Sequence, residues 1–545
     1  MSHREQAVIT PAELRQKLLD NEELALIDVR EIRPHSHGHL LFAIPLPLPR
    51  VEQRVADLIP CRSALVVVCD GGEPDVDNPE LGNRAARRLA ELGYSNVKVL
   101  EGGTAGWEAA GYELFDGVNV PSKAFGEFVE EHEGTPSITP EALKQMQDEG
   151  ADMVLLDSRP EEEFRMLSLP GGVCCPGGEL AYRVHEIVSS PDTTVVVNCA
   201  GRTRSIIGCQ SLINAAIPNK VLALRNGVMG WHLAGQQVLH GESEMAPAPG
   251  PQAMARARAS ADALAQRFVV QTVSLDTLNI WRAERDVRSL YVLDVRTGEE
   301  FEQQRLPDAV HAPGGQLVQN TDLYVATRNA RLVLVDSEQV RAVFAASWLQ
   351  QMGKENVYVL EQGWQGAETT SGEREQNILG LEQVDCSFVQ PQELHTMMSQ
   401  DSLQVLDVSL SDAYEKAHID GAWFVPRARL ATALENIPDS GTYVLTSDDG
   451  IVAQLAAAEL QALSESRVMV LAGGNRAWQQ SGLPMQTGAG NKSLKPDDMW
   501  QIPFLPDPDT GKSAEDNMRE YLSWEVELVR QIERDGTTNF KRYPH

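Results

Sequence analysis

The hydrophobic pattern of the chain repeats one motif, a short continuous apolar run that ends in an aspartate. The four runs end at Asp28, Asp157, Asp294 and Asp407. An uninterrupted apolar run of this length is typical of a strand buried in a parallel sheet. A short helical pattern precedes each run and opens at Thr10, Thr139, Ser274 and Gln390. Thr or Ser at such a position, with Pro or Glu soon after, is a helix-start signal.

Two further apolar strands follow each aspartate run. The second strands end at or near Cys69, Cys199, Asp336 and Ser447, and a helical pattern comes after each. The third strands begin at Val97, Val221, Val357 and Val468, and each leads into a glycine-containing turn. Trp107, Trp231 and Trp478 come soon after three of these turns, and we interpret them as core anchors. Strands that alternate with helices indicate α/β domains with mostly parallel sheets.

The spacing of the aspartates is that of ordinary domains, so we expect four tandem α/β domains, each a mostly parallel sheet flanked by helices. The predicted boundaries are 6–115, 134–241, 269–375 and 386–488. Residues 242–268 are predicted to be a linker, because their first part is rich in Pro, Ala and Glu.

Residues 489–545 form a C-terminal tail beyond the fourth predicted domain. The period of Leu522, Val526, Val529 and Ile532 predicts an amphipathic helix over 513–535. We expect this helix to pack on one of the domains, with the binding of a partner as the alternative.

Composition and charge exclude several classes of protein. The 545 residues are 42% hydrophobic and 23% charged, as in soluble globular proteins. The chain has no apolar run of membrane-spanning length and no apolar signal core at its start, so we expect a cytoplasmic protein. A net charge of −31 argues against nucleic acid and anionic membranes as partners. The seven cysteines suggest no disulfide framework and no zinc site, and nucleotide-binding motifs are missing, so we expect neither metal nor cofactor.

The strongest chemical signal is the stretch that runs from Cys199 to Arg204, between a strand end and a helix start. Backbone N–H groups converge at such a point, and with the helix dipole they favour an anion and the thiolate form of a cysteine. Arg202 and Arg204 add positive charge, and Gly201 lets the loop turn. We therefore predict that Cys199 is a nucleophile that meets an anionic donor, with an inert core cysteine as the alternative.

The Asp-x-Arg motif, the strand–Cys loop–helix and the closing Val-x-x-Leu-x-Gly-Gly with its Trp together resemble the rhodanese family of sulfurtransferases. The resemblance implies that Cys199 accepts sulfane sulfur from a donor such as thiosulfate, becomes a persulfide and passes the sulfur to cyanide or a thiol. It implies a second catalytic role for Arg204, which closes the loop. The residues between them are implied to form the substrate-binding cradle: Ala200, Gly201, Arg202 and Thr203.

Asp157 and Arg159 match the Asp-x-Arg motif of the family. We expect Asp157 to support the backbone rather than to act directly. For Arg159 the resemblance implies contact with the substrate, and an ion pair at the surface is the alternative.

The other three units lack a cysteine at the position of Cys199. The strand register places Asp70, Asp336 and Ser447 there. Cys69 falls one residue early, which turns its side chain to the other face of the strand, and residues 73–79 lengthen that loop. We therefore expect the first, third and fourth domains to be inactive, with residual activity of Cys69 as the alternative.

Two other functions compete with a sulfurtransferase. Phosphatases of the related loop type carry five residues between Cys and Arg, whereas the four residues here suit a single sulfur atom. A non-catalytic scaffold, or a carrier that passes persulfide sulfur to an acceptor protein, is the second alternative. Because Arg202 adds charge at mid-loop, we expect thiosulfate as the donor, with glutathione persulfide as the alternative. The expected partners are thus a small-molecule sulfur donor and acceptor.

Overall fold

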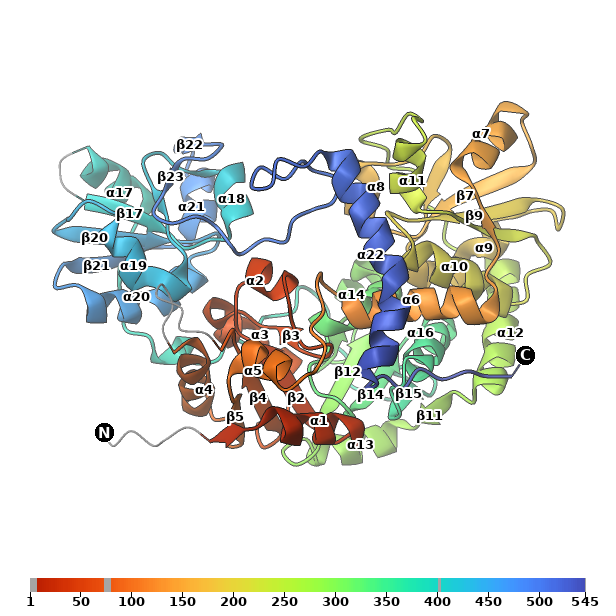
Figure 1. Ribbon diagram of the computed structural model, residues 1–545, viewed down its shortest axis with the longest axis horizontal. Coiled ribbons are helices and arrows are strands. Elements are labelled where there is room, and N and C mark those ends of the chain that lie inside the picture. Colours follow the sequence, from red (N-terminus) through yellow and green to blue (C-terminus); the bar gives the residue numbers. More distant parts are fainter. Residues whose placement is uncertain (1–6, 73–79, 400–402, 545) are drawn as a thin grey trace.

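The computed structural model describes residues 7–72, 80–399 and 403–544, and Figure 1 shows α/β units that follow one another along the chain. The elements of unit 1 are β1 (Val8–Ile9), α1 (Pro11–Leu19), β2 (Leu24–Asp28), α2 (Ile32–Ser36), β3 (Ile44–Pro45), α3 (Val51–Leu58), β4 (Leu65–Cys69), α4 (Leu81–Glu91), β5 (Val97–Leu100) and α5 (Gly103–Ala109). Those of unit 2 are β6 (Ser137–Ile138), α7 (Pro140–Asp148), β7 (Met153–Asp157), α8 (Glu161–Met166), β8 (Gly172–Cys174), α9 (Leu180–Ile187), β9 (Thr194–Asn198), α10 (Thr203–Asn214), β10 (Val221–Leu224) and α11 (Gly227–Leu233).

Units 3 and 4 repeat this order of elements. Those of unit 3 are β11 (Gln271–Val273), α13 (Leu275–Ala283), β12 (Leu290–Asp294), α14 (Gly298–Gln303), β13 (Val310–His311), α15 (Gly314–Gln319), β14 (Arg331–Val335), α16 (Val340–Gln351) and β15 (Val357–Leu360). Those of unit 4 are β16 (Ser387–Val389), α17 (Pro391–Met398), β17 (Leu403–Asp407), α18 (Ser411–Lys416), β18 (His418–Ile419), β19 (Trp423–Phe424), α19 (Leu430–Glu435), β20 (Thr442–Thr446), α20 (Ile451–Leu463), β21 (Arg467–Leu471), α21 (Gly474–Gln480), β22 (Met485–Gln486) and β23 (Asn491–Lys492).

Outside the units lie three long helices, α6 (Val120–Glu133), α12 (Pro251–Phe268) and α22 (Ala514–Asp535). Short 3-10 helices complete the described elements: η1 (Leu48–Arg50), η2 (Gly177–Glu179), η3 (Thr321–Leu323), η4 (Leu381–Gln383) and η5 (Arg427–Arg429).

The principal sheets are parallel and share one strand order. They run β1-β5-β4-β2-β3, β6-β10-β9-β7-β8, β11-β15-β14-β12-β13 and β16-β21-β20-β17-β19, the last extended by β23. The aspartate runs form the strands next to the centre, β2, β7, β12 and β17, which explains why they are apolar throughout. The predicted fold class, four tandem α/β domains with a helical C-terminal segment, is confirmed. No helix in the described part of the chain is both long and apolar enough to cross a membrane.

Local sequence signals account for the ends of the elements. Thr10 and Glu13 form a reciprocal capping box at the start of α1, and Thr139 and Ser274 cap α7 and α13 with their hydroxyls. Gln390 precedes α17 without a side-chain cap. The core positions predicted for Trp107, Trp231 and Trp478 are confirmed, since each is at most 2% exposed and its indole N–H donates to a carbonyl six residues later.

The segment predicted as a linker differs from the structure. Residues 251–268 form α12, which packs on α9 of unit 2 and α16 of unit 3. The buried face of α12 consists of Ala253, Ala257, Ala261, Leu264 and Phe268, at helical spacing. This face belongs to one apolar core that runs from the sheet of unit 2 to that of unit 3, so the two units are firmly joined.

The predicted C-terminal helix is present as α22, and the hydroxyl of Ser513 caps its first turn. Figure 1 shows α22 lying across α6, with which it makes extensive contact. One residue of the predicted face is wrong: Val526 is 48% exposed, and Leu528 is buried in its place. The helix contacts α6, unit 2 and also unit 1, where Leu528 packs with Leu41 and Phe115, so a single apolar stripe does not describe its buried face.

Candidate active site

Cys199 is the first residue after β9, at the carboxyl end of a central strand. The loop from Cys199 to Arg202 leads directly into α10. The N–H of Val228 donates to the Cys199 carbonyl at 2.8 Å, and that of Met229 donates to the Ala200 carbonyl at 3.0 Å. Gly227, with φ of +53°, allows the start of α11 to come this close to the loop, because a Cβ there would lie 2.2 Å from the Cys199 carbonyl oxygen. The loop is therefore held rigidly against the start of α11.

The strand registers show which residues correspond to Cys199 in the other units. Asp28 pairs with Cys69, Asp157 with Asn198, Asp294 with Val335 and Asp407 with Thr446. The next residue in each unit is then Asp70, Cys199, Asp336 or Ser447, as the sequence predicts. Cys69 lies within β4, is fully buried, and has its thiol pKa raised well above the ordinary value, first by burial. The longer loop predicted at 73–79 lies outside the described residues.

Acceptor oxygens occupy this position in the other units, and backbone N–H groups bind them. The carboxylate of Asp336 accepts from the N–H of Arg341 at 2.8 Å. The carboxylate of Asp70 accepts from the N–H groups of Gly72 and Gly82, both at 2.9 Å, and the hydroxyl of Ser447 accepts more weakly at 3.3 Å. In two units, then, a negative group sits where unit 2 has its sulfur. The loop is built to hold an anion at this point.

In this conformation the thiol of Cys199 is closed off from solvent, with the residue 1% exposed. Burial raises its pKa, while Arg204 and Ser205 act to lower it without outweighing burial. The charge of Arg204 thus favours the thiolate, as predicted, but in this conformation burial outweighs it and the pKa of the thiol stays above its ordinary value.

The cover over the loop comes from α22 of the C-terminal tail. A Cβ added at Gly201 would lie 3.1 Å from Glu525 Oε2 and 3.3 Å from Tyr521 Cε1, so both side chains touch the loop. The Tyr521 hydroxyl donates to Glu525 Oε1 at 2.9 Å, and the Thr203 hydroxyl donates to the same oxygen at 3.4 Å. Glu525 is 2% exposed, and its Oε2 is buried without a hydrogen-bond partner. A carboxyl group thus stands directly beside the proposed cradle.

An aromatic cluster in the tail surrounds a buried lysine next to this carboxyl group. The Lys123 ammonium lies 5.2, 4.9 and 4.8 Å from the ring centroids of Trp500, Tyr521 and Trp524. Burial lowers the pKa of Lys123 to about 8, against the attraction of Glu525. Burial also raises the pKa of Glu525, against Lys123. Sequence reasoning missed this cluster, although Trp500, Tyr521 and Trp524 in an otherwise polar tail were a visible signal.

Both arginines of the loop are held by carboxylates from elsewhere in the chain. Arg204 makes a two-point ion pair with Glu163 of α8, each N–O distance being 2.7 Å. Arg202 binds Glu127 of α6 through two contacts of 2.7 Å and also binds Glu130. Arg202, whose positive charge was expected to favour a dianionic donor, is thus already paired with two carboxylates. Its charge instead ties the loop to α6.

Arg159 forms a buried ion pair instead of one at the surface. It is 2% exposed, and its guanidinium donates to the Asp157 carboxylate at 2.9 and 2.7 Å and to the Leu167 carbonyl. Asp157 also accepts from the Asn198 amide at 2.8 Å, which links β7 to the residue before Cys199. The Asp-x-Arg motif thus joins neighbouring strands and the turn beyond them, and units 1 and 3 repeat the pair.

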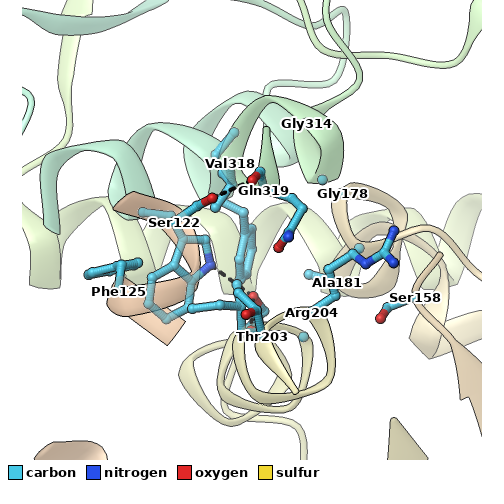
Figure 2. A pocket seen from close by; sticks show the side chains of 18 residues that line it. Ser122, Phe125, Ser158, Gly178, Ala181, Thr203, Arg204, Gly314, Val318 and Gln319 are labelled. Carbon is cyan, nitrogen blue, oxygen red and sulfur yellow. Dashed lines mark hydrogen bonds between the residues drawn. The ribbon is translucent and has the colours of Figure 1, made fainter. Parts of the chain in front are cut away.

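The opposite flank of α10 borders a narrow cavity of about 40 Å³ between units 2 and 3 (Figure 2). Thr203, Arg204 and Ser158 line it from unit 2, and Gly314 and Gln319 line it from unit 3. The Ser122 hydroxyl of α6 donates to the Gln319 carbonyl across it. Arg204 therefore lies between Cys199 and the joint with unit 3.

Comparison with known proteins yields a family model, a solved structure and a curated protein that match this chain. The model of the rhodanese-like domain matches residues 10–110, 139–234, 277–369 and 390–481. A solved structure of thiosulfate sulfurtransferase from Pseudomonas aeruginosa is 43% identical, with a TM-score of 0.93, over 99% of this chain and 100% of that one. The HTH-type transcriptional regulator Rv0324 of Mycobacterium tuberculosis (strain ATCC 25618 / H37Rv) is 31% identical over 93 residues, which are 17% of this chain and 40% of that protein. The chain thus spans less than half the length of that curated relative.

Proposed function

Because this chain belongs to the rhodanese-like domain family, in four tandem copies, we propose that it is a sulfurtransferase that works through Cys199. The likeness to a thiosulfate sulfurtransferase over the whole chain supports this reaction class. The domain that carries Cys199 is proposed to be catalytic, and the domains with Asp70, Asp336 and Ser447 are proposed to be accessory.

One observation carries the proposal, namely what the loop binds in the other units. Asp336 and Asp70 show that backbone N–H groups bind a negative group at this position. In unit 2 the same position holds the only side chain of the four that can form a bond to sulfur. A thiolate or persulfide of Cys199 would accept hydrogen bonds from backbone N–H groups of its loop, as the carboxylates do in the other units.

The proposed reaction has two steps, with balanced bonds in each. The Cys199 thiolate attacks the outer sulfur of thiosulfate; the S–S bond of thiosulfate breaks, and sulfite leaves with its electron pair. The carbon of cyanide, or the sulfur of a thiol, then attacks the outer sulfur of the persulfide. The persulfide bond breaks, Cys199 leaves as a thiolate, and thiocyanate or a new persulfide departs.

The residues around Cys199 would assist by holding negative charge. The N–H groups of Ala200, Gly201, Arg202 and Thr203 are proposed to form the cradle of the persulfide. Arg204 is proposed to stabilise the Cys199 thiolate at short range, since its positive charge acts to lower the pKa of the thiol. Arg159 is proposed to act only on the fold, through Asp157.

The first experiment is an assay of thiocyanate formation from thiosulfate and cyanide by the full chain, Cys199→Ser and Cys69→Ser. We expect Cys199→Ser to abolish turnover and Cys69→Ser to leave it unchanged, because Cys69 is fully buried within a strand. Mercaptopyruvate and glutathione persulfide, assayed in parallel, test the choice of donor. No turnover with any donor would refute catalysis and favour a scaffold or a dedicated protein-to-protein carrier.

A further inference from the structure

A second cleft, of about 330 Å³, lies where unit 1, unit 3 and the end of the tail meet. Its walls come from the end of α1, the turn before β14, the chain just after α16, and residues 536–540 beyond α22. Its lining includes no residue of the Cys199 loop or of α10, so it is separate from the candidate active site.

Two cations line this cleft, Arg328 and Lys354. The guanidinium of Arg328 lies 3.7 Å from the centre of the Phe42 ring, one nitrogen makes a long contact of 3.5 Å with the Leu18 carbonyl, and Nε is buried without a partner. Within the described ranges, no carboxylate lies within 4.0 Å of the charge of either residue. The two cations therefore enter the cleft without ion pairs.

The surrounding charges do not compensate for this pair. Burial, and after it repulsion from Arg328, lowers the pKa of Lys354 to about 8, against the attraction of Asp322. Burial likewise lowers the pKa of Arg328 to about 10, against Asp535. The carboxylate of Asp535 is already bound by the N–H and hydroxyl of Thr537. Glu355, the one acidic residue in the lining, is exposed at the edge.

We propose that this cleft is a binding site for a small doubly charged oxyanion of sulfur or phosphorus. Both side chains are partly exposed, and proteins normally pair charges that lose part of their hydration, yet this chain, with a net charge of −31, leaves these two cations without an ion pair among the described residues. A guanidinium and an ammonium together supply the N–H donors that such an oxyanion needs. Thr538 and Asn539 add polar groups to the same wall. The proposal does not rest on sulfur transfer at Cys199.

The test is calorimetric titration of the full chain with sulfate, phosphate and sulfite, at constant ionic strength set with chloride. Cys199→Asp serves as the background that excludes the loop, because a carboxylate there would take the backbone donors as Asp336 does. We expect one saturable site in this background. Lys354→Gln and Arg328→Gln should each weaken it about tenfold or more, since each loses a charge-assisted hydrogen bond. The matched control is Lys416→Gln, at a side chain 77% exposed.

A pH series keeps the test decisive if either variant folds poorly. Lys354 loses its charge as the pH rises through about 8, so binding of sulfate, which stays a dianion throughout, should weaken over that range in the Cys199→Asp background. The other charged groups that face this pair are Arg328, Asp322, Asp535 and Glu355; the pKa of Arg328 is about 10 and that of Asp322 about 6, so neither titrates through the same range. Tighter binding of sulfite than of phosphate would identify a sulfur oxyanion, and the reverse a phosphorus oxyanion. Binding that is absent, indifferent to both variants or lost in Cys199→Asp would overturn the proposal.

Discussion

The contact between α22 and the Cys199 loop can be tested with one methyl group, in the variant Gly201→Ala. The new Cβ would lie 3.1 Å from Glu525 Oε2, 3.3 Å from Tyr521 Cε1 and 3.7 Å from Leu522 Cδ2, all on α22. Two of these contacts are tighter than ordinary packing, and such overpacking costs about 1–3 kcal/mol. The backbone at Gly201 is not in the left-handed region, so the cost falls on the docking of the helix.

Cys199 is 1% exposed, so a thiol reagent is expected to reach it only when the cover opens. A cost of about 1–3 kcal/mol to the docking of α22 raises the fraction of molecules in which α22 is off the loop about 5- to 150-fold, since 1.4 kcal/mol is a factor of ten. We expect iodoacetamide to alkylate Cys199 of the native variant faster by that factor, as measured by mass spectrometry of its peptide. Cys209, fully buried in α10, should keep its rate in the same sample.

Gly441→Ala is the matched control, because a Cβ there meets nothing within 4 Å. An unchanged rate at Cys199 in Gly201→Ala, with the free energy of unfolding also unchanged, would refute the reasoning. The helix would then not be what excludes the reagent. Faster alkylation of Cys209 as well would show global unfolding instead of a local opening.

Three further predictions concern charge. Arg159→Met should lower the free energy of unfolding in urea by about 3–5 kcal/mol, because it leaves a buried carboxylate unpaired; a loss below about 1 kcal/mol would contradict the buried pair. Burial acts to raise the pKa of Glu300, but its bonds to Arg341 outweigh burial and hold it at about 2. The stability that this ion pair adds is complete above the pKa of Glu300 in the unfolded chain and is lost as the pH falls toward 2. Arg341→Met should therefore flatten the acid side of a plot of the free energy of unfolding against pH. An unchanged slope would argue against the pair. Glu525→Gln should lower the pKa of the Cys199 thiol, read from alkylation against pH, whereas exposed Glu527→Gln should not.

The sequence predicts the repeat and the position of Cys199 because both follow from local periodicity. Each buried strand has a continuous apolar run, and its aspartate marks the register, so the equivalence of Cys199 with Asp336 could be read from the chain. The start of α22 at Ser513 followed from a capping residue in the same way. Features of this kind can be predicted because they depend only on residues a few positions apart in the sequence.

The electrostatics of the site could not be predicted, because the partners come from distant segments. Glu127 lies 75 positions from Arg202, and Glu163 lies 41 positions from Arg204. Glu525, which touches the loop through Thr203, is 322 positions away. No local pattern shows which carboxylate will meet which arginine, so the sequence predicts the positive charge of the loop but not the ion pairs of Arg202 and Arg204. The same lack of tertiary information hid the burial that raises the pKa of Cys199.

The buried arginine of unit 3 has a consequence for how this chain can change over generations. Arg341 is fully buried and binds Asp336 of its own loop, Glu300 of α14 and Glu179 of unit 2. The position equivalent to Cys199 in unit 3 is thus part of the joint between two domains. Asp336→Cys would place a thiol at this position, but it would remove one of the carboxylates that pair with Arg341, and this ion network also joins the two units. Acquiring a nucleophile at this position would therefore lower the stability of the joint between units 2 and 3.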